Sequence, residues 1–203
     1  MLTSFATLMK TPLVTTAGEE HKICSLLFDD RSWTICFLIA DAGSWLSRRQ
    51  VVIRTTAIDG PDWTKKVIAV NITHQELVRC VDVSCIKPVS EQQQLALKKH
   101  FGWPDSEPRW HVPAALVPAQ SEFPAQANDD PHLRNTMDLL GYEVWSTDRR
   151  VGILSDFIME PNCWHIKYLS VRVGDWVYRE ERFVPTHIVQ SISWGMHRVT
   201  LNS

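Results

Sequence analysis

Residues 32–46 read SWTICFLIADAGSWL, and residues 163–177 read CWHIKYLSVRVGDWV. Each stretch has two tryptophans twelve residues apart, a β-rich run between them and a glycine two residues before the second tryptophan. The two stretches are offset by 131 positions. This pattern raises the question of whether the chain contains one small domain twice.

The same offset aligns residues 1–72 with residues 132–203 without a gap. Twelve of the 72 pairs are identical, whereas background composition predicts about four. The identical pairs are Trp33/Trp164, Trp45/Trp176, Trp63/Trp194, Leu2/Leu133, Leu8/Leu139, Thr16/Thr147, Ile35/Ile166, Leu38/Leu169, Gly43/Gly174, Arg48/Arg179, Thr55/Thr186 and Asn71/Asn202. We therefore predict an internal duplication, with copy one at residues 1–72 and copy two at residues 132–203.

Both copies contain short runs of β-branched and aromatic residues separated by polar turns. The predicted strands lie at residues 21–28, 33–41, 50–55 and 66–72 of copy one, and at 151–159, 164–172, 182–186 and 197–202 of copy two. Many short strands at close spacing predict a small barrel or a strongly curved sheet. The paired tryptophans are expected to be core anchors, with a ligand-stacking role as the alternative.

The second strand of the predicted hairpin differs between the copies. In copy one both faces are largely apolar, which predicts burial on both sides. In copy two, His165 and Lys167 stand where copy one has Thr34 and Cys36. We therefore expect copy two to expose a face that copy one buries.

Residues 73–131 have a different character. Thr73 is placed to cap a short helix that begins THQELVRC. A second helix is predicted in SEQQQLALKKHFGWP, which begins at Ser90, and the proline-rich segment that follows reads as a linker. The predicted organisation is a first domain at 1–80, a helical and proline-rich linker at 81–131 and a second domain at 132–203.

Composition restricts the class of partner. The 203 residues carry a formal net charge of −2 and the sequence pI is about 6.4, which argues against a nucleic-acid partner bound through a basic field. No apolar run is long enough to predict a membrane span, and the N-terminal residues lack signal-peptide features. Five irregularly spaced cysteines favour reduced thiols, so we expect a cytoplasmic protein.

Motifs for catalysis are missing from the sequence. The eight histidines form no metal-ligand spacing, and His165 and His187 are expected to be structural or solvent-facing. Asp29 and Asp30 are adjacent carboxylates, but their place in a predicted hairpin turn favours a turn-capping role over acid–base chemistry. We therefore predict no catalytic residue, no metal site and no cofactor.

Several segments together resemble the tandem PRC-barrel proteins. They are LLFDDRSWTICFLIADAGSWL at 26–46, VVIRTTAI at 51–58, VNITHQEL at 70–77, KPVSEQQQLALKKHFGWP at 87–104 and HLRNTMDLLGYEVWSTDRRVGILSDFIM at 132–159. The resemblance implies a mainly β fold with two small PRC-type β-barrels, joined by the helical and proline-rich linker. Related domains are the cytoplasmic domain of the photosynthetic reaction centre H subunit and the C-terminal domain of a ribosome maturation factor.

The sequence departs from the family pattern in its turns. Copy two keeps Gly152 at the tight start of its hairpin, but His21 stands at that position in copy one. The segments that follow the second tryptophan of each copy lack the usual glycine. These departures bear on turn geometry rather than on the fold.

The resemblance implies a non-enzymatic docking or assembly module that binds a protein partner. Loops with tryptophan beside arginine have the composition of interface hot spots. Alternatively, the tryptophan closes the end of the barrel and the arginine is simply solvated. Alternative hypotheses are an accessory to membrane electron transfer, and a small-ligand binder or cryptic enzyme. Self-association is expected as a homodimer or as an intramolecular pseudo-dimer. The candidate partner-binding residues are Trp45, Arg48, Arg49, Trp176, Tyr178 and Arg179.

Overall fold

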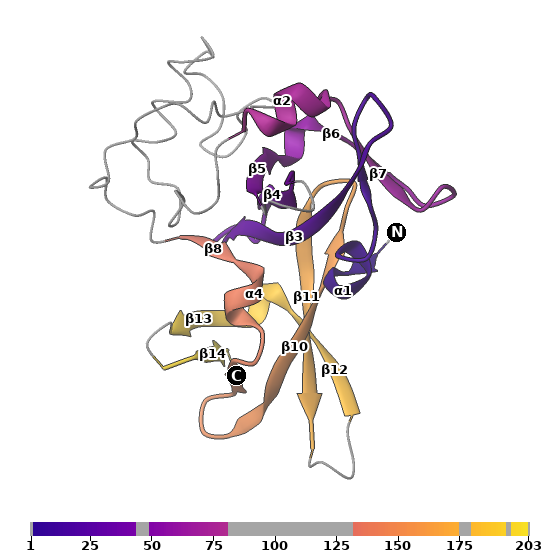
Figure 1. Cartoon of the computed structure of the whole chain (residues 1–203). Helices are drawn as coiled ribbons and strands as arrows, with labels where there is room; N and C mark the ends of the chain where they lie inside the picture. Colours follow the sequence, from indigo (N-terminus) through magenta and orange to yellow (C-terminus); the bar gives the residue numbers. More distant parts are fainter. Residues whose placement is uncertain (1, 44–48, 81–131, 175–179, 194–195, 203) are drawn as a thin grey trace, which may run out of the picture. The chain divides into compact units, whose positions relative to one another are not determined.

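The computed structural model describes residues 2–43, 49–80, 132–174, 180–193 and 196–202 (Figure 1). The chain divides into two compact units. The copy-one unit comprises residues 9–135, and the copy-two unit comprises residues 1–8 together with 136–203. The predicted second helix and the proline-rich linker lie outside the described residues.

The copy-one unit contains a sheet of seven strands in its described part. Its strand order is β5-β4-β3-β2-β7-β6, and β8 pairs with β3 off this path. The elements are β2 (Leu13–Val14), β3 (Glu20–Asp29), β4 (Ile35–Asp41), β5 (Gln50–Arg54), η1 (Thr55–Ala57), β6 (Ile58–Asp62), β7 (Val67–Val70), α2 (His74–Val78) and β8 (Leu133–Asn135).

The described part of the copy-two unit contains a second sheet of seven strands in the order β12-β11-β10-β9-β14-β13, with β1 paired to β10. The elements are β1 (Thr3–Ser4), α1 (Phe5–Leu8), α4 (Thr136–Leu139), β9 (Glu143–Trp145), β10 (Arg150–Glu160), β11 (His165–Val173), β12 (Glu180–Pro185), η3 (Thr186–Ile188), β13 (Val189–Ser193) and β14 (Arg198–Leu201). The two sheets confirm the prediction of a mainly β fold with two β domains.

The offset of 131 found in the sequence also relates the elements of the two sheets. It carries η1 onto η3, β6 onto β13 and β7 onto β14 without any shift of their bounds. It also relates unusual backbone conformations, because Trp33 and Trp164 both have positive φ, at 57° and 51°. Positive φ is uncommon outside glycine, so a shared positive φ at one repeat position indicates the same hairpin geometry in both copies.

The first strand of each copy pairs in the sheet of the other copy. Thr3 and Ser4 of β1 pair with Met159 and Ile158 of β10. At the offset of 131, Arg134 and Asn135 of β8 pair with Phe28 and Leu27 of β3, as Figure 1 shows for β8 and β3. These pairings repeat each other residue for residue, so the copies exchange their first strands reciprocally.

Different side chains hold the two exchanged strands. At β8, Nδ1 of His132, which directly precedes the strand, and Nε of Arg134 lie 2.8 and 3.1 Å from the carboxylate oxygens of Asp30. Beyond β1, the backbone N–H of Ala6 donates to Asp156 at 3.2 Å, and the Phe5 ring packs edge-on against Phe157 with centroids 6.1 Å apart. Asp30 has no acidic counterpart in copy two, where Pro161 stands at that position.

The tryptophans at the start of the repeated motif are core residues. Trp33 and Trp164 are both buried, and Trp33 stacks on Phe28 with ring centroids 5.4 Å apart. This confirms the predicted anchor role for that pair. Trp63 is half-buried, whereas Trp45, Trp176 and Trp194 lie outside the described residues.

Further predictions concern single elements. Thr73 caps α2 as predicted, and Glu76 completes a capping box with it. Cys24, Cys36, Cys80 and Cys163 are free thiols in the described part of the chain. No described helix has the length and apolar content needed to cross a membrane.

Candidate docking face and histidine cluster

Five of the six candidate partner-binding residues lie outside the described residues. They are Trp45, Arg48, Trp176, Tyr178 and Arg179. The sixth, Arg49, is half-buried, and its guanidinium donates to the carbonyl oxygen of Cys80 at 3.2 Å. This bond gives Arg49 a role within the copy-one unit. The docking role of all six residues stays a prediction.

The copy-one sheet has a largely apolar face whose cluster side chains are buried. Register places Leu27, Phe37 and Arg54 side by side across three strands, and Ile39 and Val52 form the next row. The guanidinium of Arg54 lies over the Phe37 ring, 4.8 Å from its centroid. The buried cluster on this face comprises Leu27, Cys36, Phe37, Ile39, Val52 and Leu133, with Cys24 packed against it.

The same face of the copy-two unit is partly open. Phe183 is 60% exposed where the copy-one unit has Val52 at 2%, and Leu2 is 48% exposed where the copy-one unit has Leu133 at 1%. Ile158 and Tyr168 between them are half-buried. We call the set Leu2, Ile158, Tyr168 and Phe183 the copy-two face. The prediction placed the exposure on the strand face of His165 and Lys167, which are half-buried, but Leu169 and Val171 on that face are fully buried.

Polar side chains occur on and beside the copy-two face. Lys167, which replaces Cys36, is half-buried and lies 3.5 Å from a carboxylate oxygen of Glu160. The Ser155 hydroxyl donates to the carbonyl oxygen of Ser170 at 3.0 Å. The copy-two face is therefore an apolar surface with a polar margin, which is the usual make-up of a protein interface.

Asp29 has the turn role that the sequence predicted. Its carboxylate accepts from the backbone N–H groups of Arg31 and Ser32, at 3.0 and 2.7 Å. These bonds fix the turn before Trp33. Its neighbour Asp30 instead binds the exchanged strand β8, a role that the sequence did not predict.

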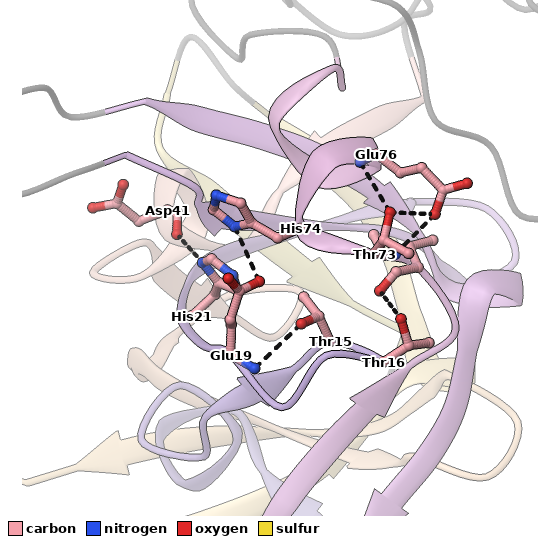
Figure 2. A network of polar contacts seen from close by, with 9 residues as sticks. Thr15, Thr16, Glu19, His21, Asp41, Thr73, His74 and Glu76 are labelled. Atoms are coloured by element: carbon pink, nitrogen blue, oxygen red, sulfur yellow. Dashed lines mark hydrogen bonds and ion pairs between the residues drawn. The ribbon is translucent and has the colours of Figure 1, made fainter.

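A polar network in the copy-one unit surrounds the loop between β2 and β3 (Figure 2). Thr15 hydrogen-bonds Glu19 in both directions, since each backbone N–H donates to an oxygen of the other residue, at 3.0 and 3.3 Å. Thr16 donates its backbone N–H and its hydroxyl to the carbonyl oxygen of Ile72. This second contact holds the loop beside the start of α2.

Two histidines meet at this loop. The imidazoles of His21 on β3 and His74 on α2 are stacked, with centroids 5.6 Å apart and planes 13° apart. His74 Nδ1 lies 3.3 Å from Glu19 Oε2, and one ligand atom from each of these three residues lies within 4.8 Å of the other two. We call Glu19, His21 and His74 the histidine cluster; Figure 2 shows how the three side chains converge.

His21 occupies a position where copy two needs glycine. A Cβ at Gly152 would collide with the carbonyl oxygen of Arg172 on the neighbouring strand. At the equivalent point of copy one, His21 Nδ1 lies 3.1 Å from the carbonyl oxygen of Asp41. A carbonyl oxygen only accepts, so Nδ1 carries the proton and donates it.

The histidine cluster was missed in the sequence because its members are far apart along the chain. The expectation that the histidines form no cluster rested on spacing, and spacing does not detect ligands from separate elements. The one available signal was the replacement of a turn glycine by His21. His165 is half-buried and His187 is exposed, in line with the expected structural or solvent-facing roles.

A cavity of about 260 Å³ lies next to His21, lined partly by Lys10, Thr11 and Lys22. It is slightly smaller than the pockets of about 300–1,000 Å³ that usually hold small molecules. It therefore gives little support to the hypothesis of a small-ligand binder.

Searches against models of known protein families and against curated proteins give no match for this chain.

Proposed function

We propose that this protein is a non-enzymatic docking module built of two PRC-type β-barrels, and that it binds a protein partner through the copy-two face. The observation that carries the proposal is the exposure of Phe183, 60% accessible at a repeat position that copy one buries. A large aromatic side chain removed from water on binding contributes strongly to affinity.

The repeat supplies an internal reference for this surface. In copy one, the same sheet face is covered and its cluster side chains are buried. Two of the exposed large hydrophobic residues of the described chain, Leu2 and Phe183, occupy positions equivalent to members of that buried cluster. An exposed apolar patch on a soluble domain commonly marks an interaction site, so we infer that a partner supplies the cover that copy one already has.

The chemistry of the partner follows from that of the face. Aliphatic and aromatic side chains at its centre favour an apolar segment of a partner protein, and the paired Lys167 and Glu160 at the margin leave little net charge to attract a highly charged ligand. The resemblance to PRC-barrel proteins, whose domains act as adaptors, points to the same function class.

The test is affinity purification from cells of the native host with the full chain. Phe183→Gln and Leu2→Gln are compared with Met196→Gln, a control at an exposed residue that is not on the copy-two face. We expect one partner to be recovered with the wild type and the control and lost with the Phe183 variant. All variants are first checked for native folding by circular dichroism, and recovery of the same proteins with all of them would overturn the proposal.

A further inference from the structure

The histidine cluster combines features that a purely structural histidine pair does not require. His21 donates its Nδ1 proton to the Asp41 carbonyl, so its Nε2 is left with a lone pair. That Nε2 is buried and has no hydrogen-bond donor among the described residues. Leaving such an acceptor without a donor costs free energy, which a ligand at this nitrogen would recover.

The orientation of His21 is the one found in metal sites. Histidines that bind metals with one ring nitrogen commonly donate the other N–H to a backbone carbonyl or carboxylate, which fixes the tautomer and the direction of the ring. The Asp41 carbonyl supplies this support. His21 is thus presented as an Nε2 ligand before any ion arrives.

His74 and Glu19 supply two further ligand atoms of the right kind and spacing. His74 Nδ1 is likewise buried and makes no hydrogen bond in the described structure, although it lies 3.3 Å from Glu19 Oε2. In a tetrahedral zinc site with bonds of about 2.0–2.2 Å, neighbouring ligand atoms are about 3.3–3.6 Å apart. The His74–Glu19 pair therefore already has the separation of two zinc ligands.

We propose that Glu19, His21 and His74 form a binding site for one divalent transition-metal ion, with zinc as the best match. Two imidazoles and one carboxylate are ligands that zinc accepts readily, and three protein ligands leave a fourth position for water. Magnesium and calcium prefer oxygen ligands and are disfavoured by the two nitrogens.

Closing the site requires a small movement of one ring. The two imidazoles are stacked, whereas an ion lies close to the plane of each ring that binds it. His21 is held by Asp41, but the His74 side chain is 42% exposed at the start of the short helix α2 and has room to turn about its Cβ–Cγ bond. The hydrogen bonds of Thr15 and Thr16 hold the backbone of Glu19 and the start of α2 in place when the His74 ring turns.

The bound ion would link the start of β3 to the start of α2 within the copy-one unit. A ligand that binds only the folded state stabilises it in proportion to the logarithm of its concentration above Kd. The site is peculiar to copy one, because copy two has Arg150 and Gly152 at the positions of Glu19 and His21. This proposal does not depend on the docking function.

The test uses the full-length chain purified with a chelator and titrated with Zn²⁺ by isothermal calorimetry. The variants are Glu19→Gln, His74→Gln and His21→Asn, the last chosen because the Asn amide can still donate to Asp41. His187→Gln is the control, since it removes an exposed histidine outside the cluster. Loss of one ligand is expected to weaken binding about tenfold or more.

We expect one Zn²⁺ per chain, a rise in the thermal midpoint with Zn²⁺, and wild-type affinity for the control. Bound Co²⁺ should show d–d absorption without a thiolate charge-transfer band, which separates this site from the cysteines. A lack of saturable binding, or equal affinity in well-folded cluster variants and wild type, would overturn the proposal. The presence of a thiolate band would also overturn it.

Discussion

The two copies share one strand order but differ in how the hairpin strands β4 and β11 are buried. From Ile35 to Ala40 every residue of β4 is buried, whereas His165, Lys167 and Tyr168 on β11 are only partly covered. The backbone pairings are equivalent. The repeat therefore preserves the inner core and the strand pairing, while the face of the sheet that carries Phe37 in copy one and Tyr168 in copy two differs in burial.

The candidate docking face and the histidine cluster follow this division between the copies. Copy one buries its outer face and carries the histidine cluster, and copy two exposes the equivalent face and keeps glycine where the cluster would begin. Duplication therefore permits specialisation, because the surface of each copy can change while both copies retain the shared core.

The largest effect is expected for Gly152→Ala. The added Cβ would collide with the Arg172 carbonyl and lie 2.8 Å from Val171 Cγ1, so we expect a loss of about 2–4 kcal/mol in the free energy of unfolding. At the equivalent position, His21→Ala should cost about 1 kcal/mol, since only one hydrogen bond is lost. Urea unfolding of both variants measures the difference. Equal losses in the free energy of unfolding would show that the two copies tolerate a side chain at this position equally well.

A smaller effect is expected from truncating the outer face. Val52→Ala removes buried methyl groups and should cost about 1–2 kcal/mol, whereas Phe183→Ala should change the free energy of unfolding by less than about 0.5 kcal/mol. The same unfolding experiment measures both. If Phe183→Ala proved as costly as Val52→Ala, the copy-two face would be a folding core rather than a free surface.

The exchanged strands provide the next test. Asp30→Ala removes the acceptor of both His132 and Arg134 and should destabilise the copy-one unit by about 1–2 kcal/mol. Pro161→Ala changes the equivalent position of copy two, where no such pair exists, and serves as the control. The rate of hydrogen exchange at the amides of β8 should rise in the Asp30 variant alone. An unchanged rate would show that backbone pairing is sufficient to hold β8 in the sheet without the Asp30 contacts.

The smallest effect is expected in the pH dependence of Asp156. Burial raises the pKa of this carboxyl, and hydrogen bonds from the backbone of Phe157 and Ala6 partly oppose the rise. Because the folded pKa lies above the unfolded one, the native state binds the proton more tightly, and this group favours folding as the pH falls. Asp156→Asn should remove that contribution. Unfolding curves of the wild type and the variant between pH 7 and pH 3 give the free energy of unfolding at each pH. The same pH dependence in both proteins would contradict the prediction.

Much of the fold was predictable from local sequence. Runs of β-branched and aromatic residues predicted β3, β4, β10 and β11, and the polar turns at Asp29 and at Glu160 predicted the two hairpins. The equivalent strands β6 and β13 and the short strands β1, β2, β8 and β9 were not predicted, because two to five residues carry too little periodicity to be recognised. The capping box of Thr73 and Glu76 was only half recognised.

The sequence by itself determined that one small β fold occurs twice, because the tryptophan spacing and the apolar patterns repeat at one offset. It also predicted that copy two would be the more exposed copy, since lysine and histidine are costly to bury, but it assigned the exposure to the face of His165 and Lys167 and not to that of Phe183. Only the tertiary structure decided that the first strands are exchanged, because each ladder obeys the same register whichever copy donates the strand. It alone brought His21, His74 and Glu19 together, because contacts between separate elements depend on how the chain folds back and leave no spacing in the sequence.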